Sequence, residues 1–238
     1  MLKMIRFLLV ALGMICSCHT AYCWEISYEG NVMPNDPVLG SGVWRVYSGC
    51  DLSQTWSDGE VLHLIDPWTD KEVRFSREAV AIPAGTPITM EARLRIASGT
   101  TPGSGLAPAF MGASTWRLAG GFASAWLWSD KMSVLNADGW FHYDTDLTQF
   151  RTIRIAMNEQ NYFWVWLDET EIFSGLAVDA WQNGITFGSS YYEATLESYW
   201  DYVCYSKEFV PVPEPSSLLA LASGLLGLGG LALRRRRE

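Results

Sequence analysis

The sequence predicts an all-β fold, an antiparallel β-sandwich of two sheets, for residues 24–209. The clearest observation is strict alternation from Ile88 to Ile96, where apolar side chains hold every second position and polar or charged ones the rest. A period of two indicates a strand with one buried face. In addition, short apolar segments recur between clusters of turn-forming residues, and no amphipathic helical stretch precedes the C-terminal tail.

Further strands are expected, in chain order, at residues 122–128, 150–157, 162–167, 184–187 and 199–205. Turn-forming residues lie between them, as in Asn136-Ala137-Asp138-Gly139 and Asn158-Glu159-Gln160-Asn161. Many short strands at fairly regular spacing are typical of an antiparallel sandwich or barrel.

Residues 1–23 have the features of a secretory signal peptide. A basic start precedes residues 7–15, an uncharged apolar run that is too short for a bilayer-spanning helix of about 20 residues. Ala21 and Cys23 are small residues at the positions that signal peptidase recognises, so the mature chain is expected to start near Trp24. A lipoprotein signal is the alternative, although the small aliphatic pair that usually precedes the modified cysteine is missing.

Residues 210–238 form a tail with three parts in a fixed order. The motif Pro213-Glu214-Pro215 comes first, an uncharged run of about residues 216–233 follows, and Arg234, Arg235, Arg236 and Arg237 come next. The run approaches the length of a transmembrane helix, and the arginines favour a cytoplasmic end. The order resembles the PEP-CTERM sorting signal. An ordinary tail helix is the alternative.

That resemblance implies a route for the protein. An exosortase-type membrane protease would cut at the motif, so the chain would lie in the inner membrane transiently and then reach the cell surface or the extracellular matrix. Carriers of this signal typically come from bacteria that make exopolysaccharide.

Composition narrows the choice of partners. Without both ends, 11 basic and 25 acidic residues remain, a net charge of about −14. Such a charge argues against nucleic acid or an anionic lipid surface as partner. Cys50 and Cys204 are the cysteines expected to remain after signal cleavage, and outside the cytoplasm they are candidates for a disulfide.

The second half of the domain resembles a concanavalin A-like, laminin G-like jelly roll. The resemblance rests on the order of the apolar segments at residues 150–155, 164–168, 185–188 and 198–203, and on the early segment 28–34. One departure is Asp168-Glu169 after the second of these segments, where relatives commonly turn with Asp-Gly. The resemblance implies a fold more than a function.

No catalytic motif is evident. Jelly-roll glucanases use Glu-x-Asp-x-x-Glu spacing to set two carboxyls about 5 to 5.5 Å apart, whereas Glu91 is followed at alternate positions by Arg93 and Arg95. His63 and His142 have no nucleophile elbow beside them and are expected to be surface or packed residues.

Two kinds of binding site remain candidates. Asp144 and Asp146 flank Thr145 and are a candidate calcium site, although solvated loop acids are the alternative, and no other cofactor is expected. Aromatic residues on both faces of expected strands form the second candidate, a platform on which sugar rings stack, unless they simply pack. They are Tyr162, Trp164, Trp166, Trp126 and Trp128.

The sequence therefore predicts an exported, non-enzymatic surface or matrix protein with a role in adhesion or glycan binding. Its expected partners are signal peptidase, the exosortase-type protease and extracellular polysaccharide, with no nucleic acid. The rival hypotheses are a polysaccharide hydrolase or lyase and a purely structural extracellular protein.

Overall fold

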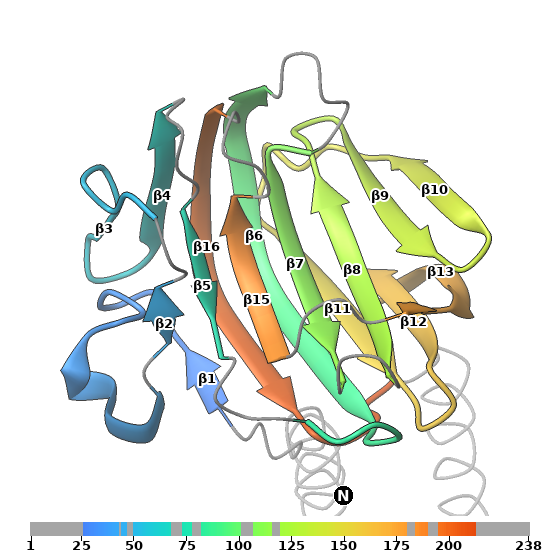
Figure 1. Ribbon diagram of the computed structural model, residues 1–238. Helices are drawn as coiled ribbons and strands as arrows, with labels where there is room; N and C mark the ends of the chain where they lie inside the picture. The colour runs from blue at the N-terminus through green and yellow to red at the C-terminus, as the bar shows by residue number, and fades with distance from the viewer. Residues whose placement is uncertain are drawn as a thin grey trace, which may run out of the picture.

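Two antiparallel β-sheets pack face to face in the computed structural model, as Figure 1 shows. The structure describes residues 26–42, 44–46, 50–67, 73–77, 82–100, 107–115, 120–179, 184–189 and 195–212. Within these residues no helix is long and apolar enough to cross a membrane. The expected signal peptide (1–23) and the sorting motif, apolar run and arginines (213–237) lie outside the described residues.

Sheet A has the strand order β13-β12-β11-β6-β16-β4-β3, and β1 also pairs with β16. Its strands are β1 (Ile26–Tyr28), β3 (Trp56–Ser57), β4 (Leu62–Pro67), β6 (Ile88–Thr100), β11 (Arg151–Met157), β12 (Tyr162–Leu167), β13 (Thr170–Leu176) and β16 (Thr195–Ser206). A 3₁₀ helix, η1 (Pro37–Gly42), lies between β1 and β2 in the chain.

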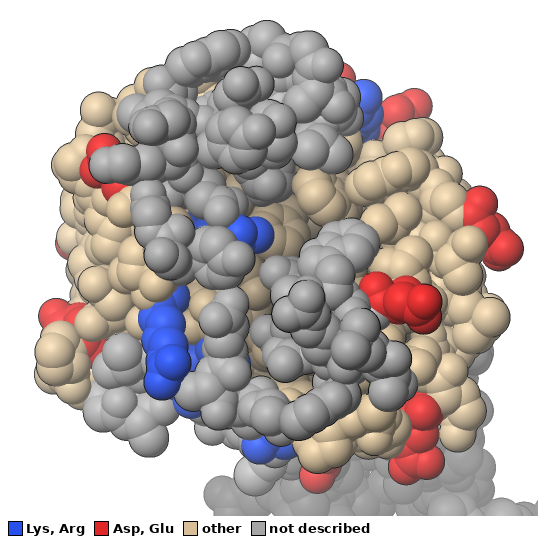
Figure 2. All heavy atoms as spheres, in the orientation of Figure 1, with Lys and Arg blue, Asp and Glu red and all other residues tan. Residues whose placement is uncertain are grey.

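Sheet B has the order β10-β9-β8-β7-β15-β5-β2, and β14 pairs with β8. Its strands are β2 (Arg45–Val46), β5 (Arg74–Ser76), β7 (Ala109–Ser114), β8 (Gly121–Leu127), β9 (Lys131–Asn136), β10 (Gly139–Asp144), β14 (Val178–Asp179) and β15 (Gly184–Ser189). In Figure 1, β7 and β8 of sheet B lie in front of β11 of sheet A. Figure 2 has the same orientation and looks onto the outer face of sheet B. The predicted two-sheet antiparallel sandwich is confirmed.

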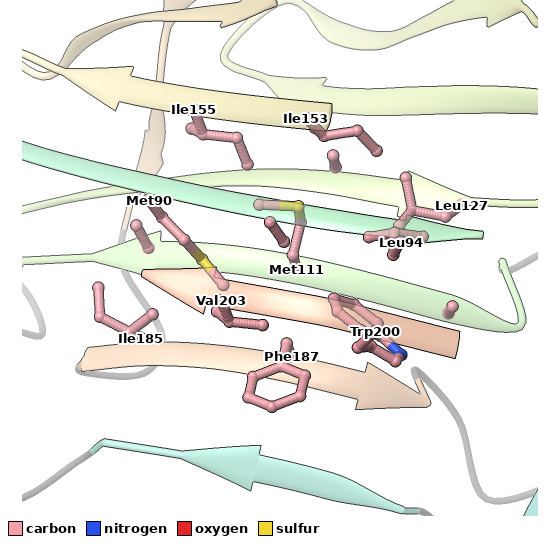
Figure 3. Close-up of a cluster of buried hydrophobic side chains, with 14 of the residues drawn as sticks. Met90, Leu94, Met111, Leu127, Ile153, Ile155, Ile185, Phe187, Trp200 and Val203 are labelled. Atoms are coloured by element: carbon pink, nitrogen blue, oxygen red, sulfur yellow. The ribbon is translucent and has the colours of Figure 1, made fainter. Parts of the chain in front are cut away.

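The core lies between the sheets, and Figure 3 shows side chains from both sheets meeting there. On β6, Met90 and Leu94 are fully buried, which confirms the alternation expected for this strand. They meet Met111 and Phe187 of sheet B in the same apolar cluster. Trp200 of β16 is also fully buried, and its indole N–H donates to Ser198 Oγ at 2.9 Å.

Each strand that the sequence predicts is present, but others are added. β7 was not expected, because all its six residues are buried and its sequence Ala-Phe-Met-Gly-Ala-Ser shows no alternation of apolar and polar side chains. Both predicted turns are confirmed: Asn136 pairs with Gly139 in the β9–β10 hairpin, and residues 158–161 connect β11 to β12.

The turn at Asp168 and Glu169 connects β12 to β13 in two residues, since Leu167 pairs directly with Thr170. Both turn residues have positive φ, 45° for Asp168 and 70° for Glu169. Tight hairpins of the primed type require this geometry and usually use Asn-Gly. Here Asp168 is held instead by Thr152, whose backbone N–H donates to Asp168 Oδ1 at 2.9 Å.

Candidate functional site

The outer face of sheet B carries a cluster of aromatic rings from three strands. Phe110 on β7 and Trp126 on β8 are register partners, and their rings stack with centroids 5.5 Å apart. Trp140 on β10 meets Trp126 edge-on, also at 5.5 Å. Phe110 is buried, Trp126 is half-buried and Trp140 is 44% exposed, so the cluster opens to solvent at the β10 side.

Hydrogen bonds to serine hydroxyls hold two side chains of this region, Trp126 and His142. The indole N–H of Trp126 donates to Ser124 Oγ at 3.0 Å. Ser133, the register partner of Trp126, has its Oγ 2.6 Å from Nδ1 of His142. The Trp126 indole is therefore held in place, with hydroxyl and imidazole groups next to it.

Arginine extends the cluster at its other side. The Arg74 guanidinium lies 5.5 Å from the centroid of the Phe110 ring. Between them in the register is Gly188, whose φ is 132° and where a Cβ would come within 2.3 Å of the Val73 carbonyl oxygen. Glycine at this position lets the backbone of β15 adopt a positive φ and approach the backbone of β5 closely. In Figure 2, several Lys and Arg atoms are visible left of the centre, and Asp and Glu atoms lie mostly toward the margin of the view.

Trp128 follows β8 directly and is half-buried. The Nζ of Lys131 lies 4.7 Å from the centroid of the Trp128 ring. The backbone N–H of Trp128 donates to the backbone carbonyl of Lys131 at 2.9 Å. One expected stacking residue thus packs against its own hairpin.

The other expected stacking residues lie on the outer face of sheet A, under a segment that we name the C-terminal strap (residues 207–212). Tyr162 and Trp164 contact each other at 4.8 Å, and Phe209 of the strap lies 4.9 Å from the Trp164 ring. Trp166 is 5% exposed. The strap therefore occupies space beside Trp164 that a sugar ring would need.

Two hydrogen bonds to one side chain hold the C-terminal strap on sheet A. Thr89 Oγ1 donates to the Glu208 carbonyl at 2.7 Å and accepts from the Val210 N–H at 2.9 Å. Both Thr89 and Val210 are buried. This attachment brings the chain to Val212, directly before Pro213 of the predicted sorting motif.

A cavity of about 340 Å³ lies beside the strap, lined among others by Trp166, Glu169 and Val212. In its lining, Glu91 accepts from Nε of Arg154 at 2.6 Å and from the Tyr202 hydroxyl at 2.8 Å. Burial, and then the nearby Glu91 carboxylate, raises the pKa of Tyr202 above its ordinary value. These polar groups satisfy one another, so the cavity has a rigid polar wall.

The structure also places the expected calcium ligands, which stay a prediction. Asp144 ends β10 and is exposed, and Asp146 is exposed in the loop that follows. Asp146 Oδ1 accepts from the Thr148 hydroxyl at 2.6 Å and from its N–H, and these bonds lower the pKa of Asp146. Among the described residues, no group of three or more His, Cys, Asp or Glu is placed to hold a metal ion.

The candidate disulfide is not formed in the structure, where Cys204 lies on sheet A and Cys50 lies between β2 and β3, against sheet B. Cys204 is a buried free thiol on β16 of sheet A. Cys50 contacts the backbone of Arg74 on β5 of sheet B, whose N–H donates to Cys50 Sγ at 3.3 Å. The core of the sandwich separates these positions. Asp201 on β16 accepts a hydrogen bond from Arg93.

Sequence reasoning missed Phe110 and Trp140 of the sheet B cluster, as well as Trp56 on sheet A, which is 45% exposed. Phe110 lies in the unpredicted strand β7, and Trp140 lies in β10, whose hairpin was expected as a turn alone. High tryptophan content was the available signal, but it does not tell which rings meet.

Comparison with solved structures finds distant likenesses. The chain matches a botulinum neurotoxin type C structure, described by its cell entry through two ganglioside molecules, with 10% identity and a TM-score of 0.47 over 71% of this chain and 44% of that one. It matches the botulinum neurotoxin serotype G binding domain with 10% identity and a TM-score of 0.48 over 76% and 47%. A protein of unknown function from Shewanella oneidensis MR-1 matches with 10% identity and a TM-score of 0.48 over 75% and 84%. The chain thus spans less than half of each neurotoxin chain.

No curated protein matches this sequence. One family model does match, and it covers residues 211–237. The match begins inside the C-terminal strap and includes the motif Pro213-Glu214-Pro215, the apolar run and the four arginines. Such a motif indicates an exported protein that an exosortase processes. Residues 211–237 of this chain are therefore a PEP-CTERM protein-sorting motif.

Proposed function

We propose that the protein is a non-enzymatic surface or matrix protein that binds an extracellular polysaccharide on the outer face of sheet B. The observation that carries this proposal is the contact between Trp126 and Trp140. An indole ring that is 44% exposed stands edge-on to a second indole, whose N–H is already tied to Ser124.

Fixed aromatic rings suit a sugar for two physical reasons. Their electron-rich faces attract the C–H bonds of a pyranose ring, and little side-chain entropy is lost on binding when the rings are already held in place. The neighbouring His142 is exposed, and while its Nδ1 bonds Ser133, its other ring nitrogen can exchange a hydrogen bond with a sugar hydroxyl.

The engagement of the carboxylates supports a binding role more than a hydrolytic one. On sheet A, Glu91 contacts Arg154 and Tyr202, and Asp168 contacts Arg151. A general acid in a glycosidase must be free to approach the glycosidic oxygen, whereas these carboxylates accept hydrogen bonds from arginine and tyrosine side chains. Binding a sugar on aromatic rings requires no pair of catalytic carboxyl groups, so these contacts support binding more than hydrolysis.

The test uses the full chain purified in detergent, with immobilised cello-oligosaccharides, deacetylated chito-oligosaccharides and mannuronate oligosaccharides as neutral, cationic and anionic probes. We expect binding to at least one probe and at least tenfold weaker binding by the Trp126→Ala/Trp140→Ala variant. A matched control is Leu176→Ala, which removes an exposed apolar side chain from β13. Release of reducing sugar, measured in parallel, would favour the hydrolase or lyase instead, and absence of binding to every probe would favour a purely structural protein.

A further inference from the structure

A second row of planar side chains crosses the outer face of sheet A. Trp56 on β3 pairs in register with His63 on β4, His63 pairs with Tyr199 on β16, and Tyr199 pairs with Arg95 on β6. Neighbouring strands lie about 4.8 Å apart, so these four side chains form one straight line across the sheet. We name them the sheet A row.

The members of the sheet A row contact one another in sequence. The Trp56 and His63 rings stack at 4.6 Å with an angle of 17° between their planes. His63 meets Tyr199 edge-on at 4.8 Å, and the Arg95 guanidinium lies 3.9 Å from the Tyr199 ring centroid. One face of Trp56 is therefore covered by His63, while the residue as a whole is 45% exposed.

Two carboxylates tie the row in place. Asp58 Oδ2 lies 2.6 Å from Nε2 of His63, and the Tyr199 hydroxyl donates to Glu197 Oε1 at 2.6 Å. Asp58 Oδ1 also accepts the backbone N–H groups of Glu60 and Val61, and Glu197 also accepts from Ser98. An ionised carboxylate has about four lone-pair positions, so Asp58 keeps about one and Glu197 about two for hydrogen bonds from a ligand. The row thus offers a fixed indole face flanked by hydrogen-bond acceptors.

We infer that the sheet A row is a second polysaccharide-binding site, so that one domain holds two polysaccharide chains on opposite faces. This inference rests on the proposed function of sheet B. Sugars combine an apolar ring face with hydroxyl donors at its edge. This matches the indole of Trp56, with Asp58 bound to the adjacent His63 and Glu197 bound to Tyr199 further along the row. An apolar protein partner would bury these carboxylates without donors, and an anionic lipid surface would be repelled by them.

The arrangement has a consequence for a matrix protein. The rings of Trp56 and of Trp140 lie on the outer faces of different sheets, and the packed core separates them. Two polysaccharide chains bound at these sites would be held apart by the thickness of the domain. Each molecule would act as a cross-link between polysaccharide chains, and multivalent contacts would strengthen retention in the matrix.

The test is the number of oligosaccharides bound per chain, measured by equilibrium dialysis of the full protein in detergent against the three oligosaccharide probes named above. This ratio does not depend on how many chains share a micelle. We expect two per chain for the wild type, one for Trp56→Ala, one for Trp126→Ala/Trp140→Ala and none for the combined variant. Trp56→Phe, which keeps a ring, and Leu176→Ala should both retain two.

The outcomes separate this inference from the proposed function. One oligosaccharide per chain, lost in Trp126→Ala/Trp140→Ala and unchanged in Trp56→Ala, would overturn the second site and leave the first. One oligosaccharide lost in Trp56→Ala alone would overturn the sheet B site and the bivalent domain. No bound oligosaccharide in the wild type would overturn both. Thermal unfolding of each variant checks that it folds, and the exposure of Trp56 predicts an unchanged melting temperature for Trp56→Ala.

Discussion

Glu91 on β6 and Arg154 on β11 are register partners, and their side chains form an ion pair in which Nη2 of Arg154 lies 2.6 Å from Glu91 Oε2. The side chains are 10% and 14% exposed, so the pair is largely removed from water. The pair lies on the outer face of sheet A, next to the C-terminal strap. The Arg154 guanidinium also donates to the Val210 carbonyl of the strap.

Replacing Glu91 with alanine is predicted to destabilise the domain by about 3 kcal/mol, because a largely buried guanidinium loses its carboxylate. Chemical denaturation followed by tryptophan fluorescence measures the loss. The Glu91→Met/Arg154→Met variant is the control, since removing both charges is expected to recover most of the stability. Equal losses in the single and double variants would show that packing matters here and the charges do not.

Replacing Thr89 with valine is predicted to detach the C-terminal strap. The change keeps the shape of the side chain but removes the donor to Glu208 and the acceptor for the Val210 N–H, which together contribute about 2 kcal/mol. Hydrogen exchange at the Val210 amide should accelerate roughly 30-fold, as that free energy implies. Thr186→Val, at a buried position on β15, should leave this amide unchanged. Unchanged exchange in Thr89→Val would contradict the attachment.

The sequence predicts β6 most clearly, because apolar and polar side chains alternate along it. Met90 and Leu94 reveal β6 because Glu91 and Arg93 alternate with them. Phe110 does not reveal β7, since the residues on both faces of that strand are buried. Periodicity carries information only where the two faces of a strand differ in environment.

The candidate site was less predictable than the fold for a related reason. The sequence identifies Trp126 as an aromatic residue on a strand, but the residues that it contacts come from β7 and β10. The order of strands in a sheet cannot be derived from the pattern of a single sequence. Trp164 is a candidate for stacking in the sequence, with packing as the alternative, because nothing in the sequence indicates that Phe209 folds back onto it. Trp56 stands in a strand of two residues, too short for any periodicity.

Replacing Glu169 with glycine is predicted to stabilise the domain by about 1 kcal/mol. At φ 70° the Cβ of glutamate is strained, and glycine adopts this conformation freely. The midpoint of urea denaturation should rise. Glu171→Gly, one position into β13, is the matched control and should lower the midpoint, because glycine weakens a strand interior. A lower midpoint for Glu169→Gly would mean that the glutamate side chain makes a stabilising contact at the cavity.

Stability is predicted to fall in alkali through Cys204. Burial, and then the Glu91 carboxylate, raises the pKa of the Cys204 thiol, whereas an unfolded cysteine ionises at about pH 8.5. The contribution of the protonated Cys204 thiol to the free energy of unfolding is therefore fully present below about pH 8.5. It is lost as the pH rises toward the pKa of the folded state, because the unfolded chain then binds fewer protons than the folded chain.

Denaturation at a series of pH values, for the wild type and Cys204→Ala, measures this loss. The difference in unfolding free energy between the two proteins should shrink above about pH 8.5, by at most about 1.4 kcal/mol for each pH unit. Other groups titrate equally in both proteins and cancel in the difference. A constant difference across the alkaline range would show that the Cys204 thiol ionises as readily in the folded chain.

The last prediction concerns the sorting motif, whose match begins at Pro211 in the C-terminal strap. Replacing Pro213, Glu214 and Pro215 with alanines is predicted to hold the protein in the inner membrane, because the apolar run still inserts while the processing protease loses its recognition site. Fractionation with an antibody against the sandwich measures the distribution between membrane and exterior. The Thr89→Val variant serves as control. This substitution loosens the strap but leaves the motif unchanged, so the variant protein should be released as the wild type is. Equal release of the alanine variant and the wild type would mean that the tail anchors the protein and does not direct its processing.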